Sequence, residues 1–240
     1  MRYWLLTVSI FITSLLHAQF GFYAEGGGNY SIIRATRTPG IIDGKGGFGF
    51  QAGGGVEYHF QNDFFMYMGA QFASEHFKKD SSAKVAGDDA AKFNYNPLFV
   101  NIPFGFGYQF PITKELGFRV YAGINTQIGV GGTLKHEATY AIPGTEGSRV
   151  VSDTHRMHYG RSINVQSEFQ SDLNNTIWGV NIGAGLNLNK NVEVAIFYQE
   201  GLTNILPGGD GAAEIDKQRA VSLNLKFYFP RNYYTAVQKL

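Results

Sequence analysis

Five ionisable residues of this chain share one setting, because each is flanked on both sides by apolar or aromatic neighbours in an alternating segment. Carboxylates, an imidazole and cationic groups gathered in one place can relay protons or guide a solute. They can also pair with one another, since an unpaired buried charge is costly. We interpret them as a structural charge cluster in the interior and keep a proton or solute path as the alternative. The residues are Glu57, His59, Arg119, Glu193 and Lys226, with Glu25 as a further candidate.

A second set of reactive side chains lies between residues 134 and 174. Two histidines and an aspartate suggest a metal site, and serine, histidine and aspartate suggest a lipid hydrolase or acyltransferase. Neither arrangement has a diagnostic spacing, and a His-x-x-His pair in a polar segment is usually solvated. We therefore expect no catalytic residue, no metal ligand and no cofactor, and a segment that binds a partner or moves freely. The residues are Ser148, Ser152, Asp153, His155, Arg156, His158 and Ser162.

The segments that hold the five charged residues read as β-strands. Residues 220–229 alternate apolar and polar side chains with the period of two that a strand requires, and they end on aromatic residues. The same pattern recurs about eight times along the chain. The expected strands cover residues 20–34, 46–60, 64–77, 93–110, 115–133, 175–189, 191–204 and 217–229.

The connections between these strands alternate in length. Tight turns follow the second, fourth and sixth strands, whereas longer loops follow the others, at 35–45, 78–92, 134–174 and 205–216. Barrels of the bacterial outer membrane have short turns on the periplasmic side and long loops outside. The pattern predicts one eight-stranded antiparallel transmembrane β-barrel, an up-and-down meander with both termini in the periplasm. A ten-stranded barrel is the alternative, if the long loop contains a hairpin with strands within Thr139–Val151 and Arg161–Phe169.

The two faces of each strand support a barrel in lipid. In the strand at 175–189, Trp178, Val180 and Ile182 alternate with glycine and asparagine, so the apolar face meets lipid and the polar face fills the lumen. Eight strands leave a lumen that side chains fill, which argues against a wide pore. Outward aromatic residues form two girdles: Phe20, Phe22, Tyr58, Phe60, Phe64, Phe110, Phe227 and Phe229 at one end, and Tyr30, Phe48, Phe72, Trp178 and Tyr198 at the other.

The beginning of the chain has the features of a secretory signal. Arg2 precedes an apolar run at 4–16, which is too short to span a membrane as a helix. We expect a signal peptide at 1–18, a barrel at 19–230 and a periplasmic tail at 231–240. The absence of cysteine excludes disulfides, and a net charge of +1 argues against nucleic acid or acidic substrates as partners.

Glycine runs in the first two strands form a smooth patch on the lipid face. Small outward residues let another membrane element approach closely, which suggests docking of a partner. The alternative is that glycine relieves crowding in a small, sharply bent barrel. The patch consists of Ala24, Gly26, Gly28, Ala52 and Gly54.

The run at 95–108, with its Asn101-Ile102-Pro103-Phe104 core, and the segment at 120–124 resemble two strands of the PorT-like outer-membrane β-barrel family. The resemblance implies a Gram-negative outer-membrane barrel, and it points to a membrane-embedded scaffold or accessory in protein secretion. It supplies no catalytic residues. We expect contact with outer-membrane lipid and with a protein partner in the membrane or periplasm. The alternatives are a surface binding or adhesion barrel, which would use its long loops, and a lipid-modifying enzyme.

Overall fold

The computed structural model describes nine strands, at residues 19–36, 44–60, 63–81, 88–113, 116–141, 148–160, 173–205 and 215–229 together with their adjoining turns. The expected signal peptide and tail lie outside these residues. The strands are β1 (Gln19–Thr36), β2 (Gly44–His59), β3 (Phe64–Ser81), β4 (Asp88–Pro111), β5 (Gly117–Ala141), β6 (Ser148–Arg156), β7 (Thr176–Asn187), β8 (Val192–Gly201) and β9 (Ile215–Tyr228).

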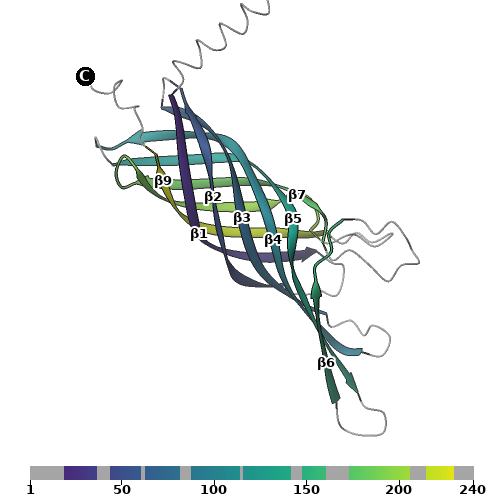
Figure 1. Ribbon diagram of the computed structural model, residues 1–240. Coiled ribbons are helices and arrows are strands. Elements are labelled where there is room, and N and C mark those ends of the chain that lie inside the picture. Colours follow the sequence, from purple (N-terminus) through teal and green to yellow (C-terminus); the bar gives the residue numbers. More distant parts are fainter. Residues whose placement is uncertain are drawn as a thin grey trace, which may run out of the picture.

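Eight of the strands close into a barrel (Figure 1). Each pairs antiparallel with its neighbour in the order β1-β2-β3-β4-β5-β7-β8-β9, and β9 pairs back on β1. The closing ladder runs from Tyr23–Tyr228 to Thr36–Ile215. Closure pairs the edges that an open sheet would leave exposed. The prediction of an eight-stranded antiparallel barrel is confirmed.

The ninth strand, β6, lies outside the ring. It pairs with the far end of β5, from Thr133–Arg156 to Ala141–Ser148, while β7 pairs with the near end of β5. The two strands project beyond the barrel as an arm, as Figure 1 shows. The hairpin of a ten-stranded barrel would need a strand within Thr139–Val151, but the two ends of this segment belong to β5 and β6, and β6 does not join the ring. The second strand expected for that hairpin, Arg161–Phe169, lies outside the described residues.

The long strands correct two expected loops. Residues 78–81 and 88–92 belong to β3 and β4, and residues 134–141 belong to β5. The polar residues in these stretches hid the strands from a search for apolar alternation. Once a strand rises above the lipid, neither of its faces needs to be apolar, and only hydrogen bonds to its neighbour hold it. At the opposite end of the barrel, which we call the short-turn end, β2, β4 and β7 finish and β3, β5 and β8 begin.

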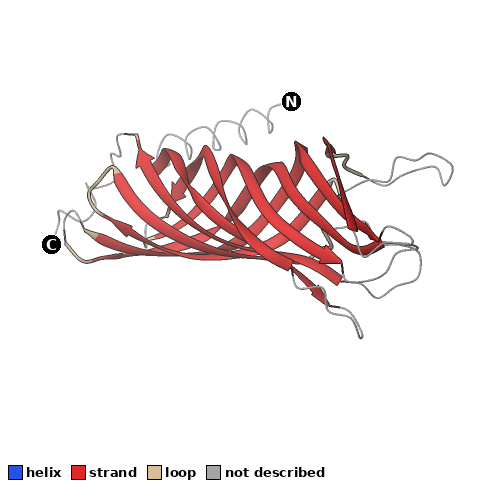
Figure 2. Cartoon of the chain, turned by 90° about the horizontal axis from the view of Figure 1, so that it is seen from below, coloured by secondary structure: helices blue, strands red, loops and turns tan. Residues whose placement is uncertain are grey.

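The side chains face the directions that the alternation of apolar and polar residues predicts. Residues of outward parity are exposed, among them Phe22, Phe106 and Ile182, whereas inward residues such as Tyr67 and Asn181 are buried. Rings of both expected girdles lie on the outer surface, and Tyr30 packs edge-on against Phe48. Figure 2 shows the strands inclined to the barrel axis. None of the described residues forms a helix that is long and apolar enough to cross a membrane.

Candidate functional site

The lumen at the short-turn end is filled by an ion-pair network around Arg119. The guanidinium of Arg119 is fully buried; its Nη2 lies 2.8 Å from Glu57 Oε2, and its Nη1 lies 2.7 Å from Glu193 Oε2. His59 Nε2 lies 3.0 Å from the same Glu57 oxygen. Strands β2, β5 and β8 thus each contribute a charge to one level of the lumen. Four of the five predicted residues meet here.

Aromatic residues complete this network. The Tyr228 hydroxyl lies 3.0 Å from Glu57 Oε1 and 2.6 Å from Glu193 Oε2, so it can donate to either carboxylate. Tyr121 donates to the second oxygen of Glu193. The Phe65 ring lies 3.8 Å from the guanidinium carbon of Arg119, within reach of a cation–π interaction. These three aromatic residues were not predicted to belong to the cluster, because only acidic and basic residues were considered, although the alternation already places them on the inward face.

The fifth predicted residue, Lys226, lies one level further into the barrel. It is opposite Glu25 on β1 and Glu193 on β8 in the strand register. Its buried Nζ lies 4.7 Å from the ring centre of Tyr23 and 4.6 Å from that of Tyr121. Lys226 therefore joins the charge cluster through aromatic faces and through the charge of nearby carboxylates. The structural role of the whole cluster stays a prediction.

The middle of the lumen is an amide network around two further carboxylates. Glu25 accepts hydrogen bonds from Gln71 Nε2 at 2.6 Å and from Asn224 Nδ2 at 3.2 Å. Glu75 is buried and accepts from Gln127 Nε2 at 2.9 Å and from Gln218. A cavity of about 40 Å³ lies among these side chains, which is room for a few water molecules. The expected link of Glu25 to the Arg119 cluster is replaced by these amide contacts.

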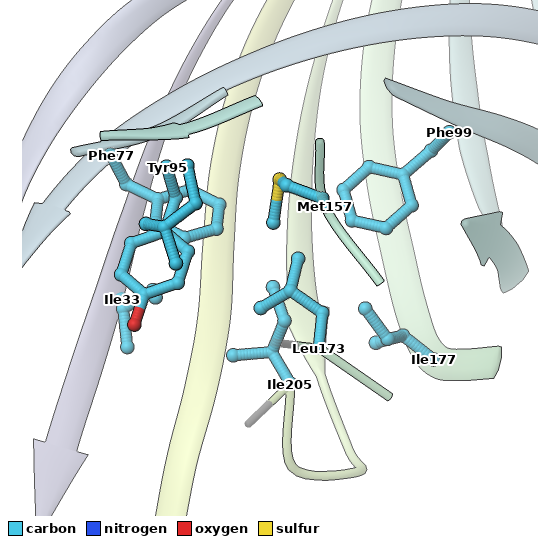
Figure 3. Close-up of a cluster of buried hydrophobic side chains, with 9 residues drawn as sticks. Ile33, Phe77, Tyr95, Phe99, Met157, Leu173, Ile177 and Ile205 are labelled. Carbon is cyan, nitrogen blue, oxygen red and sulfur yellow. The ribbon is translucent and has the colours of Figure 1, made fainter. Parts of the chain in front are cut away.

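An apolar cap closes the far end of the lumen (Figure 3). After β6 the chain turns inward, where Met157 N bonds to Gly132 O at 3.1 Å and Gly160 N bonds to Leu173 O at 3.0 Å. Met157 lies at the centre of the group that Figure 3 draws, with buried side chains from β1, β3, β4, β5 and β7 around it. The cap consists of Ile33, Phe77, Tyr95, Phe99, Leu134, Met157, Leu173, Ile177 and Ile205.

The lumen therefore has three layers: an ionic and aromatic layer, an amide layer and an apolar cap. Buried side chains of all three layers occupy the lumen. The sequence pattern did not predict the cap, because Met157, Leu173 and Ile205 lie in connections where alternation gives no inward or outward parity.

The reactive side chains expected between 134 and 174 lie mostly on the arm. Asp153 Oδ2 is 3.9 Å from His155 Nδ1, and the rings of His155 and His158 stack with their centres 6.1 Å apart. Ser152 and Asp153 are neighbours on one strand, so they project from opposite faces of the arm. Ser162 lies outside the described residues. No group of three or more His, Cys, Asp or Glu residues that suits a metal ion occurs among the residues described.

The small-residue patch has the expected register, since Ala24 is opposite Gly54 and Gly26 is opposite Ala52. The glycines of the patch differ in their surroundings. A Cβ on Gly26 or Gly28 would meet only a carbonyl oxygen 3.8 Å away, whereas a Cβ on Gly54 would lie 2.6 Å from Tyr23 O. Crowding therefore explains Gly54 but neither Gly26 nor Gly28. Docking of a partner on this patch stays a prediction, for which Gly26→Leu with Gly28→Leu is the suitable test.

The three consecutive glycines of β1 should respond differently to alanine. Gly27 faces the lumen, where a Cβ would overlap Leu223 O and the side chain of Asn224. We expect Gly27→Ala to lower the free energy of unfolding by about 1–3 kcal/mol or more, as overpacking does. Gly26→Ala and Gly28→Ala point outward into open space and should change it by no more than about 0.5 kcal/mol. Urea unfolding of the three variants in lipid vesicles measures this, and equal losses would contradict the orientation of β1.

Several solved structures resemble this chain over most of its length. Ail, the attachment invasion locus protein of Yersinia pestis, is 14% identical with a TM-score of 0.39, over 88% of this chain and 99% of Ail. OprG from Pseudomonas aeruginosa is 11% identical with a TM-score of 0.44, over 87% of this chain and 96% of OprG. No curated protein matches the chain.

A protein family matches most of the chain. The family described as "Outer membrane protein beta-barrel domain" matches residues 16–206, which is well over half of the chain. The match includes β1 to β8, the arm, the cap and the Arg119, Glu57 and Glu193 side chains of the network, whereas Tyr228 on β9 lies beyond it. It agrees with the closed ring and with the apolar outer face. The chain therefore belongs to the outer membrane protein beta-barrel domain family and is a β-barrel of the bacterial outer membrane.

Proposed function

We propose that this protein is a non-conducting outer-membrane platform that binds a protein partner at the cell surface through its β5–β6 arm. The observation that carries the proposal is the arm itself, an ordered pair of strands that rises beyond a filled and capped barrel. Because side chains occupy the lumen, the parts that project beyond the barrel are the surfaces available to bind other molecules. The alternation of loop lengths supports an orientation in which the arm faces outward and both termini face the periplasm.

The chemistry of the arm suits a protein partner. Strand β6 ends the strand order, so one of its edges has no neighbour among the strands that the structure describes. A free strand edge can pair with a strand of another chain. Val150 and Val151 are 62% and 42% exposed and project from opposite faces of the arm. A partner that adds a strand at this edge would cover one of these valines and gain apolar contact.

The absence of cysteine from the chain makes the orientation directly testable. Val150→Cys places a thiol on the arm, and Lys190→Cys places one in the exposed turn at the short-turn end. On intact cells, a membrane-impermeant maleimide should label the arm variant and leave the Lys190→Cys variant unlabelled until the outer membrane is permeabilised. The reverse pattern would contradict a platform at the cell surface.

The binding role has its own test. Residues 138–151 can be replaced by Asn-Gly, because Glu137 and Ser152 are cross-strand partners that a two-residue turn can join. A photo-reactive residue at position 150 of the full-length protein should give discrete protein adducts in living cells, and the same residue at position 190 should not. A competing excess of the shortened barrel should leave those adducts intact, whereas excess full-length barrel should remove them. Adducts that the shortened barrel also removes would place the binding elsewhere.

A scaffold role in protein secretion is the second candidate. It is supported by the resemblance of residues 95–108 and 120–124 to PorT-like strands; these segments lie in the middle of β4 and near the beginning of β5. The test compares the secreted and surface proteins of cells with and without the gene. Accumulation of exported proteins in the periplasm of the deletion strain would favour secretion over surface binding. Unchanged export would exclude it.

A further inference from the structure

A basic groove lies on the outer face of the strands beyond the apolar band. It is an open hollow of about 520 Å³ formed by side chains of β2, β3, β4 and β5. It differs from the lumen, since its residues have the outward parity of the lipid-facing side chains. Its charged members are four lysines and one glutamate, with a histidine beside them. The groove is lined by Lys45, His76, Lys78, Lys92, Asn94, Asn96, Lys135 and Glu137.

The strand register aligns the lysines in one row. Lys45 is opposite Lys78, Lys78 is opposite Asn94, and Asn94 is opposite Lys135. Side chains directly opposite each other on neighbouring strands have Cβ atoms about 5 Å apart, and like charges in that position are destabilising. The row thus gathers three lysines on four adjacent strands, and an anion between them would offset the repulsion of their like charges.

One carboxylate within the groove is affected by the positive charges of the lysines around it. Lys135 Nζ lies 2.6 Å from Glu137 Oε1, and Lys92 is opposite Glu137 in the register. The hydrogen bond from Lys135 and the charges of Lys135, Lys92 and Lys78 hold the pKa of Glu137 below its ordinary value. Glu137 is the only carboxylate among the residues that line the groove, where it lies with four lysines. The groove keeps an excess of positive charge, although the net charge of the whole chain is only +1.

The height of the groove above the lipid-facing band identifies the kind of anion. The last regularly paired row of β2, β3 and β4 that holds apolar outward side chains contains Phe50, Ser74 and Leu98, and Phe48 lies in the irregular step just beyond it. Lys78 lies four residues beyond Ser74 on the same strand. At about 3.3 Å per residue and a tilt of about 40°, this places the lysine row roughly 10 Å above that level. Headgroup phosphates of membrane lipids lie in this zone, and cations next to a membrane surface are attracted to them.

We infer that this basic groove binds the phosphate groups of an anionic glycolipid of the outer leaflet. Lysine ammonium groups bind phosphate as mobile point charges, and three or four of them within one hollow can share the oxygens of a phosphorylated sugar. Asn94 and Asn96 supply amide groups for the sugar hydroxyls beside it. Binding of such a lipid would neutralise the lysine row and hold the strand extensions close to the membrane surface. The inference shares with the proposed function only the outward orientation of the arm.

The test uses the full-length barrel in detergent micelles, so it does not depend on the orientation in cells. The probes are lipid A with both phosphates and the same lipid after enzymatic removal of the phosphates. We expect the phosphorylated lipid to bind more tightly, with an affinity that falls as ionic strength rises. Lys78→Gln with Lys92→Gln and Lys135→Gln should weaken its binding by about 100-fold, at about fivefold for each lysine.

Two control variants separate local charge from total charge and from folding. Lys78→Arg with Lys92→Arg and Lys135→Arg keeps the charge and should keep the affinity, while Lys190→Gln removes one charge at the opposite end and should change nothing. The heat-dependent shift in gel mobility shows that each barrel is folded.

Equal binding of both lipids, or unchanged binding by the triple glutamine variant, overturns the inference. Full competition by millimolar inorganic phosphate would indicate a site for free phosphate instead, and lysine-dependent binding of heparin without binding of lipid A would indicate a polysaccharide; either result also overturns it.

Discussion

Arg119→Met should lower the free energy of unfolding of the barrel by about 3–5 kcal/mol, the cost of removing one partner from a buried ion pair. The substitution keeps an unbranched apolar stem but removes the guanidinium, and it leaves Glu57 and Glu193 buried without the cation that lies within 3 Å of both. Tyr228 can donate to one carboxylate at a time, so it cannot replace the guanidinium. Urea unfolding of the refolded barrel in lipid vesicles measures the loss.

The chain offers matched controls for this experiment. Arg219 pairs with Glu200 at 2.8 Å near the surface, where both side chains are partly exposed to solvent. Arg219→Met should cost far less, because water can solvate the carboxylate that remains. Adding Glu57→Gln and Glu193→Gln to Arg119→Met should recover part of the loss, since the two carboxylates that lose the guanidinium are then neutral. If Arg119→Met and Arg219→Met cost the same, the Arg119 cluster is not the structural core described here.

Phe99→Ala should lower the free energy of unfolding by about 3–5 kcal/mol, as deletion of a large buried side chain does. Phe99 is fully buried in the cap, and its ring packs against Tyr159 with the ring centres 6.1 Å apart. The cap joins five strands to the chain that follows β6, so these neighbours cannot close the cavity without losing other contacts. The same unfolding measurement applies.

Phe106→Ala is the control on the same strand. Phe106 has outward parity and is 54% exposed, so lipid tails can fill the space that its ring leaves. Its replacement should cost clearly less than that of Phe99. Equal losses would mean that the cap contributes no more than a lipid-facing ring. A larger loss at Phe106 would mean that the faces of β4 are assigned in the wrong sense.

Most of the barrel could be predicted from the sequence because lipid and lumen impose opposite demands on alternate residues. The expected strand at 217–229 agrees with β9 (Ile215–Tyr228), and the expected inward residues Glu57, Arg119 and Glu193 do meet. Alternation fixes the face to which a side chain points. It does not fix the height at which that side chain meets others, and for this reason Glu25 was expected near Arg119 but binds Gln71 and Asn224.

The arm and the groove were hidden for a different reason. The lysines of the groove lie at positions 45, 78, 92 and 135, far apart in the chain, and only the register of four strands brings them together. The strand ends that carry Lys78, Lys92 and Lys135 lack the apolar outward side chains of the lipid-facing strands, so they were expected to be loops. The net charge of the chain is near zero and does not show where the charges lie, so it gave no sign of the lysines that gather in the groove.

Strand β5 connects the arm to the interior of the barrel as one strand from Gly117 to Ala141. A partner that pulls on the arm would load the ladder between β4 and β5 along the direction of the strands, from Asp88–Tyr140 down to Pro111–Gly117. Hydrogen bonds loaded in this direction share the force and must yield together, whereas bonds in a peeled hairpin break one after another. Tension on the arm would therefore pass along the backbone of β5 to Arg119 and its two carboxylates, and the closed ring would resist it as an anchor.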